Sequence, residues 1–79
     1  MLHVRGQALA EVRGTMVLAQ ENRFRIETED GRSVLFVLGK GSGPSLGTIA
    51  SWAKAGQIVV VRYKGKLVAA PVAEQVHPV

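Results

Sequence analysis

The amino-acid sequence predicts a mainly β fold, a small five-stranded barrel with one short helix between its third and fourth strands. Short segments of alternating or continuous apolar residues, separated by polar and glycine-rich turns, are typical of strands. Residues 46–55 have apolar positions at helical spacing instead. The order strand, strand, strand, helix, strand, strand is that of an OB-like barrel. With 79 residues the chain has room for one core, and hence for one domain, 1–79.

The first strand is expected at residues 10–19, where apolar residues keep a period of two around Gly14. A glycine inside a strand often marks a sharp bend, which a small barrel requires. Residues 1–9 have little periodicity and form either a flexible arm or the beginning of this strand. The side chains expected to point into the barrel are those of Val12, Met16 and Leu18.

The second and third strands are expected at residues 23–28 and 32–38, and the turn between them decides which side chains are buried. A two-residue type I′ turn that ends at Gly31 would leave Phe36 on the outside. A type I turn followed by Gly31 as a left-handed bulge residue buries Phe24 and Phe36 together. We favour the second turn because it buries both phenylalanines.

The helix is expected directly after a linker at residues 39–44, which is too rich in glycine to hold regular structure well. Ser45 is a good N-cap, and Gly56 is a good residue to end the helix. Trp52 is interpreted as the plug at the bottom of the barrel. The stripe expected to face the core consists of Leu46, Ile49, Ala50 and Ala53.

The fourth and fifth strands are expected at residues 58–63 and 67–76, joined by a tight turn at residues 64–65. Pro71 cannot donate a hydrogen bond to a neighbouring strand, so the fifth strand has to bulge there or lie at an open edge. Residues 77–79 are interpreted as a frayed tail.

The charge distribution favours a polyanionic or acidic partner. The chain has ten Lys and Arg residues against six Asp and Glu, and no acidic residue occurs between Asp30 and Glu74. In an OB barrel the ligand crosses the outer face of the second and third strands. This predicts a basic face that binds RNA or single-stranded DNA weakly and with little sequence preference. The residues predicted to form it are Arg23, Arg25, Arg62, Lys64 and Lys66.

A second candidate site is the glycine-rich linker before the helix. It lacks the spacing of a P-loop. Its bare backbone amides, its lysine and the helix dipole could together hold an anion. The alternative is that the linker is a plain connector. The residues of this candidate anion loop are Lys40, Gly41 and Ser42.

The alternative function is a protein-interaction or homo-oligomerisation module. The favoured turn leaves Leu35 and Val37 on the outer face of the third strand, where the helix, a partner or the N-terminal arm has to cover them. An exposed edge strand would serve the same purpose. An SH3-like barrel is the alternative fold, and strand pairing separates the two, since an OB barrel pairs its first strand with both the second and the fourth.

The sequence indicates no enzyme. His3 and His77 lie near the ends of the chain, and no spacing gives a serine a basic partner. The chain has no cysteine, and its carboxylates cluster beside a turn among arginines, so we expect no metal and no cofactor. The apolar runs are far shorter than the roughly 20 residues of a membrane span, and residues 1–7 lack a secretion signal. The expected compartment is the cytoplasm.

Several segments also match a known family, from about residue 12 to residue 62. They are Gly14-Thr15-Met16-Val17, Asn22-Arg23-Phe24-Arg25-Ile26-Glu27, Glu29-Asp30-Gly31, Val34, Gly39-Lys40, and Gly56 before Ile58-Val59-Val60. In these segments the chain resembles the S1-like OB barrel of bacterial translation initiation factor one. That family binds the small ribosomal subunit through basic loops, so the resemblance implies RNA contacts by Arg23, Arg25, Lys40 and Lys64.

The chain departs from this family in three places. Residues 41–52 are longer and better organised as a helix than the family's segment, Gln57 stands where the family has Asp, and the alanine-rich end lacks the family's basic residues.

Overall fold

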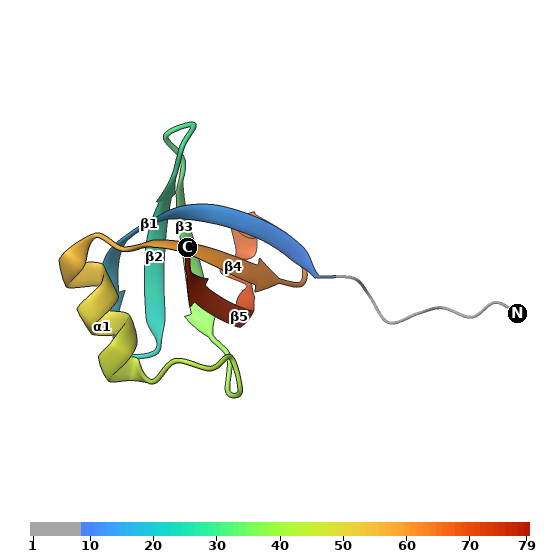
Figure 1. Ribbon diagram of the computed structural model, residues 1–79. Helices are drawn as coiled ribbons and strands as arrows, with labels where there is room; N and C mark the ends of the chain where they lie inside the picture. The colour runs from blue at the N-terminus through green and yellow to red at the C-terminus, as the bar shows by residue number, and fades with distance from the viewer. Residues whose placement is uncertain (1–8) are drawn as a thin grey trace, which may run out of the picture.

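The computed structural model describes residues 9–79 (Figure 1). Its elements confirm the predicted mainly β fold with one α-helix between the third and fourth strands. The arm predicted at residues 1–9 lies, apart from Leu9, outside the described residues. The elements are β1 (Ala10–Gln20), β2 (Arg23–Thr28), β3 (Ser33–Leu38), α1 (Leu46–Ala55), β4 (Ile58–Tyr63), the 3₁₀-helix η1 (Leu67–Ala69) and β5 (Val72–Pro78).

The five strands form one sheet whose pairings close on themselves in the order β1-β2-β3-β5-β4. β1 is the longest strand and pairs antiparallel with β2 along one half and with β4 along the other. In Figure 1 it arches over the neighbouring strands, and the hairpin of β2 and β3 projects beyond it. The ring closes through a short parallel contact between β3 and β5, which joins Val37 to Val72 and Leu38 to Ala73.

A bulge in β1 corrects the predicted alternation of its side chains. The register with β2 shifts between Met16 and Leu18, so one extra residue lies in β1 there. An extra residue turns every following side chain to the opposite face. Leu18, predicted inside, is therefore 50% exposed, and Ala19 packs against the core in its place.

The β2–β3 turn has the conformation that buries both phenylalanines. Gly31 has a φ of 87°, and its amide donates to the Thr28 carbonyl oxygen over 2.9 Å. The register places Phe24 opposite Phe36, and both side chains are buried. The favoured sequence interpretation is confirmed, and Leu35 and Val37 lie on the outer face, half-buried.

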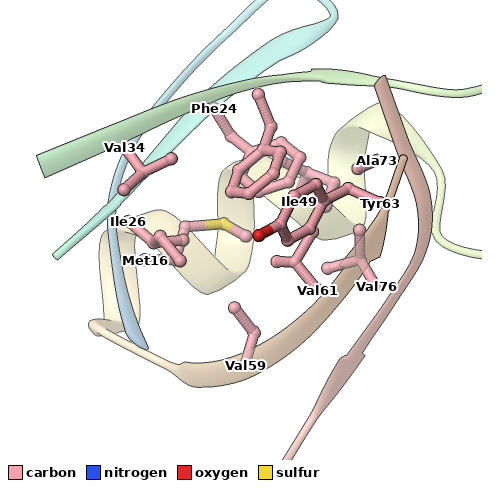
Figure 2. Packing of buried hydrophobic residues seen from close by; sticks show 11 residues of the cluster. Met16, Phe24, Ile26, Val34, Ile49, Val59, Val61, Tyr63, Ala73 and Val76 are labelled. Carbon is pink, nitrogen blue, oxygen red and sulfur yellow. The ribbon is translucent and has the colours of Figure 1, made fainter. Parts of the chain in front are cut away.

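The predicted limits of the helix are confirmed, but its buried face is different. The Ser45 hydroxyl accepts from the Thr48 amide over 3.1 Å, and Gly56 ends the helix with a φ of 66°. Ile49 is buried and enters the core, while Leu46 and Ala50 are exposed. Ile49 is the helix residue that lies within the core cluster (Figure 2), and Trp52 packs against that cluster half-buried.

The connection from β4 to β5 is longer than the predicted tight turn. Residues 67–69 form η1, and β5 begins only at Val72. The apolar side chains of these residues led to the prediction of a strand, whereas Leu67 packs against the core from η1. Pro71 precedes β5, so its missing amide hydrogen breaks no strand pairing, and its carbonyl oxygen accepts from the Val37 amide over 3.0 Å.

The C-terminal residues are paired, which corrects the predicted frayed tail. His77 and Pro78 belong to β5 and lie opposite Val60 and Val59. The Val79 amide donates to the Ile58 carbonyl oxygen over 3.0 Å. The end of the chain therefore contributes to the closure of the sheet.

The core lies inside the ring of strands and contains three aromatic side chains in a row (Figure 2). The Phe24 and Phe36 rings stack with centroids 5.4 Å apart, and the Tyr63 ring lies 5.6 Å from Phe36. Because these three rings are buried, they offer no exposed face on which a nucleotide base could stack.

Candidate functional site

Two arginines from β2 line a small hollow on the outside of the sheet. The hollow has a volume of about 170 Å³. In the register of the sheet, Arg25 lies between Leu18 of β1 and Leu35 of β3, so aliphatic side chains flank it on both sides. Its Nη1 donates to the Ser33 hydroxyl over 3.2 Å. The lining residues are Leu18, Gln20, Arg23, Phe24, Arg25 and Leu35.

The arginines of this hollow keep their full positive charge. Between residues 9 and 79 the ion pairs are Arg32 Nε to Asp30 Oδ2 at 3.1 Å and Arg62 Nε to Glu11 Oε1 at 3.2 Å. Neither Arg23 nor Arg25 takes part in one. An anionic ligand would therefore bind these two guanidinium groups without first displacing a carboxylate from either of them.

Arg62, predicted to join the same face, is paired with a carboxylate and is distant from the hollow when the separation is measured along β1. Arg25 is opposite Leu18, whereas Arg62 is opposite Glu11, seven residues earlier in β1. At about 3.3 Å per residue these positions are about 23 Å apart along the strand. Glu11 also neutralises part of the Arg62 charge.

The predicted lysines follow β4, at the end of the sheet where β5 begins. Lys64 and Lys66 are exposed and flank Gly65 in the β4–β5 connection. A path across the sheet runs from Arg23 to Val37, on to the start of β5, and then to Tyr63. This path ends beside Arg62 as well as Lys64, so Arg62 differs from the lysines by its ion pair with Glu11 and not by its place in the sheet. Three strand spacings of about 4.8 Å and the one-residue step from Val72 to Ala73 make the path about 18 Å. A nucleotide chain of a few residues could span it.

No strongly exposed aromatic ring is present in the described part of the chain. Phe24 and Phe36 are buried, Tyr63 is 8% exposed, and Trp52 is half-buried. The Tyr63 ring belongs to the core cluster and is not available for stacking. Its burial favours contacts to phosphate groups over contacts to base faces.

The glycine-rich loop between β3 and α1 forms the floor of a wider depression. Its volume is about 490 Å³, and its residues include the candidate anion loop Lys40, Gly41 and Ser42. Asn22, in the turn between β1 and β2, forms the opposite side. Arg23 of the hollow follows Asn22 in the chain, but the two hollows share no lining residue.

The outer face of β3 is only partly covered. Leu35 and Val37, the candidate interaction face, are half-buried. The pairing of β3 with β5 is limited to Val37 and Leu38, so no strand of residues 9–79 lies on that side of the earlier part of β3.

A carboxylate at the tip of the β2–β3 hairpin has a perturbed acidity. The pKa of Asp30 is lowered, first because the Thr28 hydroxyl donates to its carboxylate, and further because Arg32 lies beside it. Desolvation opposes this shift without reversing it. Since Asp30 is fully exposed and paired within its own turn, we assign it to the hairpin and not to a site.

Over residues 9–79, no three His, Cys, Asp or Glu side chains gather as metal ligands would. The same part of the chain contains no helix with the length and apolarity of a membrane span.

Comparison with known proteins found no match to this chain among protein-family models, curated proteins or solved structures. The site is therefore argued from geometry and charge.

The sequence interpretation missed Leu18 and Gln20 as residues of the outer hollow. Their position depends on the bulge in β1, which neither glycine nor proline marks in the sequence. It also missed Asn22, which reaches the loop depression because the β1–β2 turn lies against the end of β3: the Leu38 amide donates to the Asn22 carbonyl oxygen over 2.7 Å.

Proposed function

We propose that this chain is a non-catalytic, OB-type binding module that binds RNA or single-stranded DNA weakly, mainly through its backbone phosphates. The pairing of β1 with both β2 and β4 supports the OB type over an SH3-like barrel. It also agrees with the fold implied by the resemblance to the S1-like barrel of initiation factor one, which we retain for the fold alone.

The observation that carries this proposal is the pair of unneutralised arginines in the outer hollow. Arg23 and Arg25 lie on β2, the strand that OB barrels use for their ligands. The flanking leucines offer apolar contact to a sugar or base edge, while the guanidinium groups fit phosphate oxygens. Lys64 and Lys66 extend the positive charge towards β5.

The expected affinity is low. Exposed ion pairs contribute about 0.2–1 kcal/mol each, and no exposed aromatic stack adds to them in the described residues. A dissociation constant on the order of micromolar or weaker follows. Sequence preference should be small, because phosphate contacts carry no base information.

The test is fluorescence anisotropy of a labelled single-stranded oligonucleotide of about ten nucleotides at low salt, within the size range of OB-fold sites. We expect Arg25→Gln to weaken binding several-fold. Lys54→Gln is the matched control, since Lys54 is exposed at the far end of α1 and the charge lost is the same. No anisotropy change with the unaltered chain, or equal effects of the two substitutions, would overturn the proposal.

One observation favours a second function, pairing with another strand. In the described part of the chain, no strand pairs with β3 before Val37 on its β5 side, and open edges accept strands from other chains. Analytical ultracentrifugation at micromolar concentration separates the two functions. A stable dimer supports strand pairing, and a monomer that binds oligonucleotides supports the first proposal.

A further inference from the structure

The outer hollow is a slot between two rows of side chains on the sheet. One row consists of Leu18, Arg25 and Leu35, which lie opposite one another on β1, β2 and β3. The next row contains Gln20 and Arg23, again opposite each other. All five residues line the hollow, so both long walls of the slot are built from side chains of neighbouring strands.

The distance between the two rows fits one flat ring. Arg23 and Arg25 are two residues apart on β2, so they project from the same face about 6.6 Å apart. A planar ring in van der Waals contact on both of its faces needs about 7 Å. Phe24 lies between the rows with its ring in the core, so its backbone forms the floor. The two arginine side chains can therefore contact both faces of one ring.

The bulge in β1 provides an apolar wall of this slot. Without the extra residue before Leu18, that side chain would point into the barrel. It is instead 50% exposed on the outside and faces the slot from β1, while Leu35 lines it from β3. An aromatic ring that enters between these leucines loses contact with water on its apolar surface, which favours binding.

Arg25 is the more restrained of the two arginines. Its Nη1 donates to the Ser33 hydroxyl, and its side chain is half-buried, whereas Arg23 is exposed. A side chain that is already held loses less conformational entropy when a ligand packs on it. Guanidinium groups stack on aromatic faces and attract them as cations, so these arginines can replace the aromatic rings that the core has buried.

The polar groups of the slot select the kind of ring. The Gln20 amide presents a donor and an acceptor, and the edges of nucleobases carry both. The ring of an aromatic amino acid offers no such edge. No carboxylate lines the slot, so a phosphate attached to the ring compound meets only positive charge there.

We propose that this slot binds one nucleobase, stacked between Arg23 and Arg25 with its edge towards Gln20. The assignment rests on the nucleic-acid function proposed above and adds a base contact to its phosphate contacts.

The first test compares two single strands that carry the same phosphates, by fluorescence anisotropy at low salt. One has about ten thymidines, and the other has abasic residues at every position. We expect the thymidine strand to bind about fivefold more tightly, the lower end of the contribution of one stacked base. Equal binding of the two strands overturns the base slot and leaves the phosphate contacts intact. No binding of either strand overturns the proposed function and the slot together.

Substitutions that keep the charge identify the stacking residue. Arg25→Lys should reduce the preference for the thymidine strand to about twofold, since an ammonium has no plane to stack, and should leave binding of the abasic strand nearly unchanged. Arg13→Lys is the matched control, because Arg13 is exposed on β1 opposite Val60 and does not line the slot. A preference that survives in Arg25→Lys, or that falls equally in Arg13→Lys, overturns the assignment.

The base edge is tested at Gln20. Gln20→Ala should weaken binding of the thymidine strand about twofold, as for one hydrogen bond at an exposed position, and should not affect the abasic strand. Equal effects on both strands would place Gln20 outside the base contact and overturn that part of the assignment.

A titration followed through the backbone amide signals by NMR locates the ring and tests the alternative ligand. We expect thymidine 5′-monophosphate to shift the signals of residues 18, 20 and 23–25 in a saturable way, and ribose 5-phosphate to shift them much less. N-acetyltyrosine amide represents an aromatic peptide side chain. If it shifts the same signals at the same concentrations as the nucleotide, the slot accepts aromatic rings in general and the nucleobase assignment is overturned.

Discussion

Gly14 is the residue at which β1 has no room for a side chain. A Cβ there would lie 2.7 Å from the carbonyl oxygen of Glu27 in β2 and 3.2 Å from Cδ1 of Ile26. The sequence predicted a special role for this glycine, as a bend. The structure gives a different physical reason, the close approach of the neighbouring backbone.

We predict that Gly14→Ala destabilises the protein by about 1–3 kcal/mol, the usual range for overpacking a filled site. Gly47→Ala is the matched control. A Cβ at Gly47 meets only Ser45 Oγ at 3.8 Å, and alanine favours the helix, so a gain of about 0.5 kcal/mol is expected. Urea denaturation measures both. A Gly14→Ala variant as stable as the unaltered chain would contradict the close approach.

Asp30 stabilises the β2–β3 hairpin only while it is ionised. Its pKa is lowered because the Thr28 hydroxyl donates to the carboxylate and Arg32 lies beside it. A carboxyl group with a lowered pKa in the folded state adds stability above its unfolded pKa, about 3.9, and this stability is lost as pH falls through the folded value. Asp30→Asn should therefore be slightly less stable than the unaltered chain at neutral pH.

The difference should shrink as the pH falls from the unfolded pKa through the lowered folded value. The measurement is the urea midpoint of both chains across this range, with the Asp30 carboxyl titration by NMR as a direct check. A difference that stays constant with pH would show that the effect does not come from ionisation.

At the scale of elements, the capping of α1 was predictable because its signals are local. A serine directly before the apolar stripe and a glycine directly after it define the helix, and both act as the sequence indicated. The limits of β2 and β4 were predictable for the same reason, since strict alternation or a continuous apolar run extends over the whole strand.

We predict that Ser45→Ala lowers the free energy of unfolding by about 1 kcal/mol, because the Thr48 amide loses its acceptor. Ser51→Ala is the control on the same helix. Ser51 is exposed and its hydroxyl caps nothing, so a change within about 0.5 kcal/mol is expected. Equal losses in urea denaturation would contradict a capping role for Ser45.

The elements that were predicted wrongly depend on contacts distant in sequence. β5 begins where it pairs in parallel with β3, at Val72 opposite Val37. The sequence around Val72 contains no signal for that pairing. The outward side chain of Leu18 depends on a bulge relative to β2. Because these pairings join strands far apart in the chain, the local pattern of one strand cannot specify such offsets.

At the scale of the whole molecule, the basic residues within residues 9–79 fall into two kinds. Arg32 and Arg62 are paired with Asp30 and Glu11. The four remaining residues of the predicted basic face, Arg23, Arg25, Lys64 and Lys66, take part in no ion pair there, and neither do Arg13, Lys40 and Lys54. The sequence predicted the total charge and its concentration in the second half of the chain. It did not predict this division, since Glu11 and Arg62 meet only when β4 pairs with β1.

The salt dependence of oligonucleotide binding tests this division. Four unpaired cations that each neutralise one phosphate give a slope of log K against log salt of about −2.8 for a single strand. Lys64→Gln should reduce the magnitude of the slope by about 0.7, because one phosphate contact is lost. Arg62→Gln removes the same charge two residues earlier and should leave the slope nearly unchanged, because Glu11 already balances that arginine.

The slopes come from anisotropy titrations at several salt concentrations. If the two substitutions change the slope equally, binding depends on net charge alone, and the arrangement of β2 and the β4–β5 connection has no part in it.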